Sequence, residues 1–365
     1  TDTFYLLVFE ATVMLEKIGM KVLQSLDAEL AHDIALFYLR TNIFSQIKIP
    51  HYPKLRTSLS GVTISNPIGL AAGFDKNGVA IDALSRLGFG FIEIGAVTPS
   101  AQPGNAKPRA FRLKREKAIV NHYGFNNVGM AKVNNRLQKF NKKSVIGLNI
   151  GANKQSLDMK GDFSKVLTFC GDNINFATIN ISSPNTKHLR DFHNKGQLKE
   201  LLSEVIKNNK KLLVPIPIFI KISPDLKLTQ LEEIVDITDQ YQLAGIVATN
   251  TSTDYGLLKD TKAFSEGGIS GSPLLHKSTK ILAQVSIISD GKIPLIGVGG
   301  VSSGADAFMK ICAGASAIQL YSALAFVGPS LIASILKELN TILDINGFNN
   351  ISEAVGSKKV EYASS

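Results

Sequence analysis

Short apolar runs rich in β-branched residues alternate with helical patterns along most of the chain, from about residue 65 onward. The runs are Ile68 to Ala72, Gly90 to Ile94, Val145 to Ile150, Phe176 to Ile181, Ile216 to Ile222, Gly245 to Thr249, Pro294 to Val298 and Ala315 to Leu320. Helical patterns between them include Val79 to Leu87, Leu198 to Leu212, Leu228 to Tyr241 and Ala305 to Ala313. Eight strands, each followed by a helix, predict a parallel (β/α)8 TIM barrel of the α/β class. An open doubly wound sheet is the alternative, for which we would expect fewer strands.

The first 45 residues have a different pattern and predict a helical extension ahead of the barrel. Phe4 to Leu15 is almost entirely apolar, but it is too short for a transmembrane helix, which needs roughly 20 apolar residues. A second helix is predicted to begin after Asp27 as N-cap, with Glu29 in its first turn. Its periodicity places Leu30, Ile34, Phe37 and Tyr38 on one face. Such helices suit a membrane interface or a tunnel, or else they simply pack against the barrel.

We therefore expect a helical segment over 1–45, a barrel over 46–350 and a flexible tail over 351–365, where few apolar residues remain. Leu59 to Ile64 is predicted to contribute a strand to a small hairpin that closes the bottom of the barrel. No basic segment with a small-residue cleavage site precedes the first helix, so a secretory signal is not expected. The sequence does not begin with Met, so an upstream anchor or presequence could have been removed.

Composition and charge narrow the classes of function. The hydrophobic content of 44% is that of an ordinary globular protein. Neither Cys170 nor Cys312 belongs to a CxxC pair, which disfavours a disulfide framework or a metal site and favours a reducing compartment. The net charge of +10 would suit nucleic acid or an anionic membrane. The basic cluster at 107–117 contains only one aromatic residue, Phe111, so nucleic acid is not expected and membrane proximity or solubility explains the charge better.

Polar side chains follow the predicted strands at their carboxyl ends, where α/β barrels place their chemistry. The strand that begins at Phe176 runs into Asn180-Ile181-Ser182-Ser183-Pro184-Asn185-Thr186. Ser183 could transfer a proton there, with Asn180 and Asn185 as hydrogen-bonding groups. The alternative is a strand end closed by a serine-proline turn.

The other strand ends supply groups of matching chemistry. Lys76 and Lys221 follow apolar runs, and a buried lysine is costly unless it is paired, so both indicate an anionic ligand or a reduced cofactor. Solvated surface lysines are the alternative. The run Gly297-Val298-Gly299-Gly300 suits a phosphate held by backbone N–H groups, or else tight packing of a strand against a helix.

Six motifs follow one another along the chain: AAGFDKNG (71–78), VTPSAQPGNAKPRAFR (97–112), NHYGFNN (121–127), NISSPNT (180–186), GGISGSPL (267–274) and GVGGVSSG (297–304). Together they resemble the motifs of the class 2 dihydroorotate dehydrogenases, and the resemblance covers about residues 20–345. The resemblance implies an FMN-containing barrel that oxidises (S)-dihydroorotate to orotate in pyrimidine (UMP) biosynthesis. It also implies that the electrons pass to ubiquinone or another membrane quinone.

The resemblance further implies a role for individual residues. Ser183 matches the catalytic base, and a serine rather than the cysteine of class 1 indicates class 2. The substrate-binding positions are Lys76, Asn121, His122, Tyr123, Gly124, Phe125, Asn180, Asn185, Asn250 and Thr251. The FMN-binding positions are Ala72, Gly73, Phe74, Asp75, Lys76, Ala96, Asn149, Asn180, Lys221, Thr249, Gly271, Gly300, Tyr321 and Ser322. Ala96 departs from many members of the family, which have a hydroxyl residue there. A quinone tunnel would use Gln24, His32, Arg112 and Tyr321.

The implied chemistry moves a proton to Ser183 and a hydride to flavin N5, with Lys221 stabilising the anionic reduced flavin. We expect a monomer, held at a membrane surface by the N-terminal helices: the inner membrane of a bacterium on its cytoplasmic side, or the mitochondrial inner membrane. One alternative is another FMN barrel oxidoreductase with a different anionic substrate, although Asn121, Asn185 and Asn250 suit a cyclic imide better. The other is a non-catalytic module that binds a membrane surface.

Overall fold

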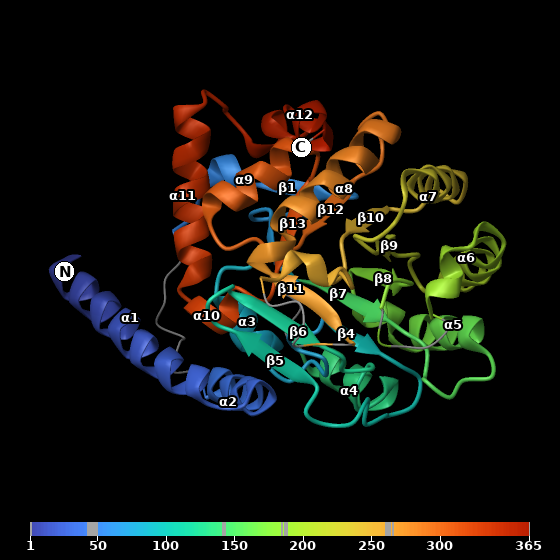
Figure 1. The fold of residues 1–365 in the computed structure, drawn as a ribbon, viewed down its shortest axis with the longest axis horizontal. Helices are drawn as coiled ribbons and strands as arrows, with labels where there is room; N and C mark the ends of the chain where they lie inside the picture. The colour runs from blue at the N-terminus through green and yellow to red at the C-terminus, as the bar shows by residue number, and fades with distance from the viewer. Residues whose placement is uncertain are drawn as a thin grey trace.

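The computed structural model describes residues 2–41, 50–140, 144–183, 185, 189–259, 264 and 266–364, with side chains from Met14 onward. Eight parallel strands close into a barrel (Figure 1). Around the barrel they are β3 (Ile68–Leu70), β4 (Phe91–Val97), β7 (Val145–Ile150), β8 (Phe176–Asn180), β9 (Ile218–Ile222), β10 (Gly245–Ala248), β12 (Leu295–Val298) and β13 (Ala317–Leu320). The (β/α)8 prediction is confirmed, and each of the eight predicted strands is found.

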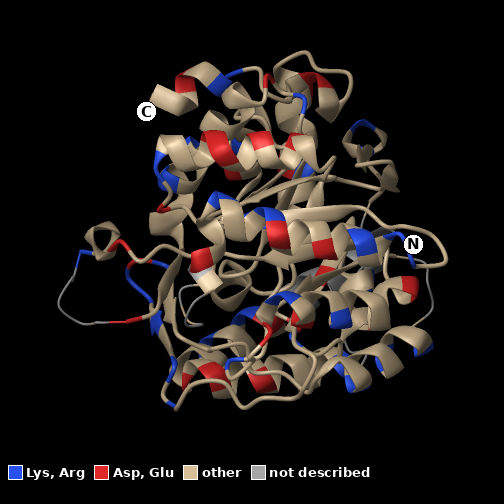
Figure 2. Cartoon of the chain, turned by 90° about the vertical axis from the view of Figure 1, so that its right-hand side faces the viewer, with Lys and Arg blue, Asp and Glu red and all other residues tan. Residues whose placement is uncertain are grey.

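Helices cover the outside of the barrel because each presents an apolar stripe to the strands. They are α3 (Ile81–Arg86), α4 (Met130–Lys139), α5 (Met159–Cys170), α6 (Lys195–Asn209), α7 (Leu228–Gln240), α8 (Leu275–Ile288), α9 (Gly304–Cys312), α10 (Leu324–Val327) and α11 (Leu331–Ile345). Short 3-10 turns lie at η2 (Pro53–Leu55), η3 (Gly171–Asn173), η4 (Leu189–His193), η5 (Tyr255–Leu257) and η6 (Ser272–Leu274). On the face that carries α5, α6 and α7, basic and acidic residues are interspersed rather than separated by sign (Figure 2).

Large aromatic side chains fill the lower half of the barrel. Phe91, Phe176 and Phe219 pack edge to face, with ring centroids 6.0 and 5.6 Å apart. Glycines make room for these rings: a Cβ on Gly69 would lie 2.3 Å from Phe91 Cζ, and one on Gly147 would lie 2.1 Å from Phe176 Cζ. These rings therefore close the bottom of the barrel, and ligands have access to the interior from the carboxyl ends of the strands.

A β-hairpin completes this closure. Strands β1 (Thr57–Leu59) and β2 (Val62–Ile64) pair antiparallel. Their side chains Leu59 and Ile64 are buried in the same apolar cluster as the three phenylalanines. The predicted hairpin is thus present at the bottom of the barrel, but Leu59 to Ile64 is not one of its strands: this segment contains the end of β1, the turn at Ser60 and Gly61, and β2.

Sequence reasoning missed a second sheet. Strands β11 (Gly268–Gly271), β6 (Ala118–Asn121) and β5 (Ala110–Leu113) pair antiparallel in that order. Each has only four residues, and β6 pairs with a partner about 150 positions later in the chain, so no local pattern marks it. The basic cluster at 107–117 contains strand β5 and leads directly into strand β6.

Two helices precede the barrel: α1 (Asp2–Ser25) and α2 (Ala28–Arg40). Asp27 caps α2 as predicted, because its Oδ1 accepts hydrogen bonds from the backbone N–H groups of Glu29 and Leu30, both at 3.0 Å. Apolar side chains remain exposed on both helices: Met14, Leu15, Ile18, Val22, Leu30, Phe37 and Tyr38. Among the described residues, no helix combines the length and apolar character needed to cross a membrane.

Two arginines beside and within strand β5, Arg109 and Arg112, hold these two helices in place. Arg109 donates from Nη2 and Nε to the Glu29 carboxylate at 2.8 and 3.1 Å, and the two side chains are only 6% and 11% exposed. Arg112 donates to backbone carbonyls at the end of α1, the shortest contact being 3.2 Å to Gln24 O. The bidentate ion pair between Arg109 and Glu29 positions α2, because it is costly to leave either charge buried without the other.

Replacing Arg109 with Met should lower the free energy of unfolding by about 3 kcal/mol, because the buried Glu29 carboxylate keeps only Lys107 as a charged partner, at 3.3 Å and largely exposed. Urea unfolding followed by circular dichroism measures the loss. The double variant Glu29→Leu/Arg109→Met removes both charges and should recover most of it. Equal losses in the single and the double variant would show that the ion pair does not dock α2.

The tail predicted to be flexible is folded instead. It forms η7 (Ile351–Ala354) and α12 (Lys359–Ser364). Ile351 and Ala354 are buried, and the backbone N–H groups of Gly356 and Lys358 donate to carbonyls at the end of α9 at 3.0 and 2.9 Å. A few well-placed apolar and backbone contacts thus order a segment whose composition alone suggested fraying.

Candidate active site

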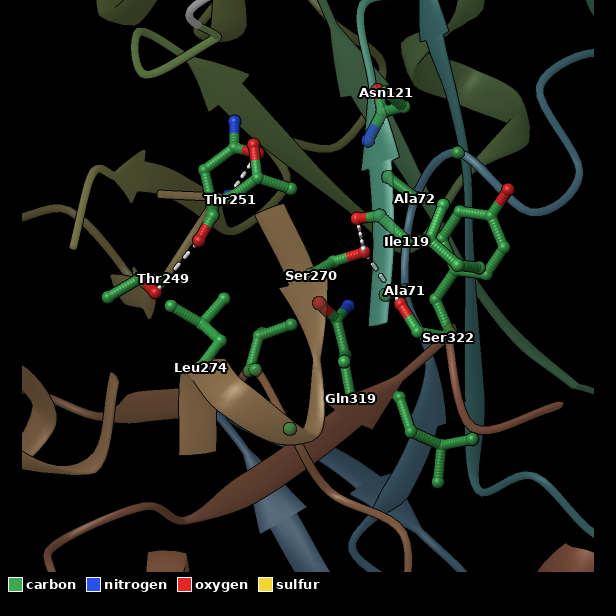
Figure 3. Close-up of a pocket in the computed structure, with 18 of the residues that line it drawn as sticks. Ala71, Ala72, Ile119, Asn121, Thr249, Thr251, Ser270, Leu274, Gln319 and Ser322 are labelled. Atoms are coloured by element: carbon green, nitrogen blue, oxygen red, sulfur yellow. Dashed lines mark hydrogen bonds between the residues drawn. The ribbon is translucent and has the colours of Figure 1, made fainter. Parts of the chain in front are cut away.

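A pocket opens at the carboxyl ends of the barrel strands and is bordered by β6 and β11 of the small sheet (Figure 3). Most of the residues singled out in the sequence line it. They are Ala72, Gly73, Lys76, Ala96, Asn121, Tyr123, Gly124, Phe125, Asn149, Asn180, Ser183, Asn185, Lys221, Thr249, Asn250, Thr251, Gly271, Gly300, Tyr321 and Ser322. Residues from every part of the barrel therefore meet at one place, as expected for strand ends in this fold.

Three of the predicted substrate- and FMN-binding residues do not line the pocket, and neither do the predicted tunnel residues Gln24, His32 and Arg112. The His122 imidazole lies 3.9 Å from the Glu266 carboxylate and stacks beside Phe111. The Asp75 carboxylate accepts backbone N–H groups of the turn that follows it, such as that of Ala80 at 2.8 Å. Burial raises the pKa of Asp75. Phe74 packs edge-on against Tyr321, with ring centroids 5.5 Å apart. Asp75 and Phe74 thus shape the loop after β3, while His122 faces away from the pocket.

Sequence reasoning also missed residues of the site. Ile119, Ser270, Leu274 and Gln319 line the pocket. Glu93 does not line it but hydrogen-bonds two residues that do, Asn149 and Gln319. The available signal was a single polar residue within an otherwise apolar strand, which both Glu93 and Gln319 show.

The Ser183 hydroxyl lies at the end of β8 and is 6% exposed. Its Oγ accepts a hydrogen bond from the backbone N–H of Asn185 at 3.3 Å. The Asn185 side chain donates in turn to the Asn121 carbonyl at 3.2 Å, which ties the loop after β8 to strand β6. Pro184 and Thr186 of the same motif lie outside the described residues. This arrangement presents an alcohol oxygen at the pocket wall with a fixed orientation.

The two predicted lysines both line the pocket, where Lys221 is buried and Lys76 is half-buried. Lys76 Nζ donates to Gly73 O at 2.8 Å and lies 4.2 Å from the centre of the Tyr123 ring. Burial lowers the pKa of Lys76 to about 8, with Glu29 acting in the opposite direction. Burial also lowers the pKa of Lys221, opposed by Glu93. Across the described chain neither lysine has a carboxylate within ion-pair distance, so each is free to hold an anionic ligand.

Backbone groups at the other end of the pocket suit a phosphate. Gly300 has φ of +81°, and a Cβ there would lie 2.5 Å from Leu275 Cα, so its backbone packs directly against the start of α8. In the part of the chain that the structure describes, the N–H groups of Gly300, Val301 and Ser322 have no protein acceptor. The predicted tight packing is therefore found at Gly300, and the unpaired N–H groups are of the kind that bind a phosphate.

The pocket extends toward the N-terminal helices. Phe326 and Val327 line it, and Gln24 of α1 donates from Nε2 to Phe326 O at 2.8 Å. The His32 ring of α2 lies 6.1 Å from that of Tyr321, which lines the pocket. Burial, and secondarily the charge of Lys76, lower the pKa of His32 to about 3, so His32 is neutral at physiological pH. The helical extension thus forms part of the surroundings of the site.

The fold and the site define an α/β-barrel protein whose pocket holds two lysines and unpaired backbone N–H groups, which suit anionic ligands. Residues 54–343 match the family model described as "Dihydroorotate dehydrogenase". The chain is 44% identical over 350 residues to "Dihydroorotate dehydrogenase (quinone)" of Cereibacter sphaeroides, covering 96% of this chain and 99% of that one. It is 39% identical to the mitochondrial "Dihydroorotate dehydrogenase (quinone)" of Mus musculus over 342 residues, 91% and 87% of the two chains.

Solved structures agree with these sequences. The ligand-free DHODH of Eimeria tenella superposes with a TM-score of 0.85 at 32% identity, covering 91% of this chain and 99% of that one. The complex of the Eimeria tenella DHODH with ferulenol also gives a TM-score of 0.85. The chain belongs to the dihydroorotate dehydrogenase family.

Proposed function

We propose that this protein oxidises (S)-dihydroorotate to orotate for pyrimidine synthesis and passes the electrons to a membrane quinone. The observation that carries the proposal is the convergence of Ser183, Lys76 and the asparagine amides on one pocket, in a chain similar over nearly its whole length to enzymes with this name. The serine at position 183 supports the quinone-dependent class in particular.

The residues of the pocket fit FMN as the cofactor. The free N–H groups of Gly300, Val301 and Ser322 would hold its phosphate, and Lys221 would face the ring. Gln319 offers the ring a hydrogen-bond acceptor, because its Oε1 is buried without a partner among the described residues. Ala96 lines the pocket but has no hydroxyl, so only its backbone can hydrogen-bond to the ring. When bound, FMN supplies the acceptor for the hydride removed from the substrate.

The remaining side chains would bind and deprotonate the substrate. Lys76 pairs with the substrate carboxylate, and the amides of Asn121, Asn185 and Asn250 match the donors and acceptors of its ring. Ser183 Oγ takes the proton from the ring carbon next to the one that loses hydride. An alcohol is a weak base, so a hydrogen-bonded path must carry its proton away.

The N-terminal segment, residues 1–45, would guide the quinone. Gln24, His32 and Arg112 lie on or against α1 and α2, and Tyr321 connects them to the pocket. The exposed apolar side chains of these helices would enter the interfacial layer of a membrane, which makes the protein peripheral. We place it, as a monomer, at the cytoplasmic side of a bacterial inner membrane or at the mitochondrial inner membrane.

A steady-state assay tests this function. The FMN-loaded protein should reduce a soluble quinone analogue in the presence of dihydroorotate, and orotate should perturb its flavin spectrum. Another barrel oxidoreductase would bind flavin but respond to neither compound. A protein that binds liposomes through residues 1–45 yet takes up no flavin would be a membrane-binding module instead.

A further inference from the structure

Glu93 is a fully buried carboxylate in the middle of β4, directly beneath the pocket. Its two oxygens accept hydrogen bonds from Asn149 Nδ2 at 2.6 Å and from Gln319 Nε2 at 2.5 Å. Both of these amides line the pocket, whereas Glu93 does not. A buried charge of this kind is stable only where hydrogen bonds replace its water, and here two pocket amides supply them.

The carboxylate dictates which way the amides point. An ionised carboxylate only accepts hydrogen bonds, so the amide nitrogens must face Glu93 and the carbonyl oxygens must face away. The Asn149 carbonyl then accepts from Asn180 Nδ2 at 2.9 Å. The Asn180 carbonyl accepts from Asn250 Nδ2 at 3.4 Å and from the backbone N–H of Ser182 at 3.3 Å. One directional chain of amides therefore runs from β4 to the loop after β10.

The Glu93 carboxylate also dictates the orientation of the Gln319 amide. Gln319 gives its amide nitrogen to Glu93, which leaves its Oε1 buried and without a partner among the described residues. Figure 3 shows the Gln319 amide reaching into the cavity. An unpaired buried acceptor is costly, which indicates that a ligand N–H completes it.

We propose that Glu93 is a positioning residue that fixes the orientation of the amides on the pocket floor, and thereby orients substrate through Asn180 and Asn250 and presents Gln319 Oε1 to the cofactor. The inference rests on the proposed function, since it assigns a role within the same site. It differs from a simple charge effect, because the negative charge of Glu93 by itself repels an anionic ligand.

The positioning role of Glu93 and its negative charge have opposite effects on orotate affinity, so a variant can distinguish them. Glu93→Gln removes the charge but introduces an amide that can donate as well as accept. The amides of Asn149 and Gln319 are then no longer forced to point their nitrogens at position 93. Positioning predicts that orotate binds the FMN-loaded variant about tenfold more weakly, the equivalent of one hydrogen bond. A charge effect predicts tighter binding. The measurement is a titration of the flavin absorbance with orotate at about pH 6, where the charged forms of Lys76 and Lys221 are favoured.

A double-mutant cycle tests whether Glu93 acts on Asn180 through Asn149. Asn149→Ala cuts the chain between Glu93 and Asn180, so Glu93→Gln should cost less than about threefold in that background. Glu338→Gln is the matched control, since its carboxylate also accepts two N–H groups, at Gly304 and Ala305, but lies outside the pocket. Its orotate affinity should match that of the parent.

Unchanged or tighter orotate binding in Glu93→Gln, or losses that multiply in the double variant, would overturn the inference. If Glu93→Gln does not fold, Glu93→Asp replaces it: the charge stays, but the shorter side chain cannot hold both amides, and orotate should again bind more weakly. A parent protein that takes up no FMN would defeat the proposed function, which is a different result from any of these.

Discussion

Replacing Ser183 with Ala should lower the rate of dihydroorotate oxidation by about 10²- to 10⁴-fold, the usual contribution of a positioned general base. The change removes only the Oγ at the pocket wall, and among the described residues the hydrogen bond lost is that from the Asn185 N–H. Flavin content and orotate affinity should stay close to those of the parent. The measurement is the rate of flavin reduction when dihydroorotate is mixed with the anaerobic enzyme.

Ser164 provides a matched control for this substitution. Its hydroxyl is also buried, on α5, and has no partner among the described residues, so Ser164→Ala removes the same group without affecting the site. Flavin reduction in that variant should be as fast as in the parent. If Ser183→Ala were to lose less than about tenfold, Ser183 could not be the base.

Replacing Lys76 with Met should weaken orotate binding at pH 7 by about tenfold to a hundredfold, because a charge-assisted hydrogen bond to the carboxylate is lost. The parent should also show a characteristic pH dependence. Burial sets the pKa of Lys76 to about 8. Below this pH the lysine is charged and orotate affinity is constant, whereas above it affinity falls by about tenfold per pH unit because binding must first protonate the lysine.

The pH dependence should disappear in Lys76→Met, leaving weak binding that does not change between about pH 8 and 9. The control is Lys160→Met, which removes a lysine on α5 whose partner is the exposed Glu200. That variant should keep both the affinity and the slope of the parent. A slope that persists without Lys76 would assign the titration to another group. All measurements need saturating FMN, since Lys76 also borders the cofactor part of the pocket.

The sequence predicts the barrel and most of the pocket because both depend on local patterns. Apolar β-branched runs mark the eight strands, and the residue that follows each run necessarily lies at the same end of the barrel. Ser183, Lys76 and Lys221 could therefore be placed together without any knowledge of tertiary contacts. Asp27 was equally predictable, since an N-cap acts on its own helix.

Features that depend on distant parts of the chain were not predictable in the same way. The sheet of β5, β6 and β11 forms between strands of only four residues whose pairing is set by tertiary context. His122 belongs to a motif that lines the pocket, but its own side chain faces Glu266 instead. Glu93 is a single acid in an apolar strand, and only the contacts with Asn149 and Gln319 reveal why its charge can be buried.

The central claim is that this pocket transfers electrons from dihydroorotate through a bound flavin to a quinone. Anaerobic titration of the FMN-loaded protein tests it most directly. Dihydroorotate should bleach the flavin absorbance in a one-to-one ratio, with orotate as the product, and a soluble quinone should then restore the oxidised spectrum. A flavin that stays oxidised in excess dihydroorotate, or that dihydroorotate reduces but no quinone reoxidises, would contradict the account.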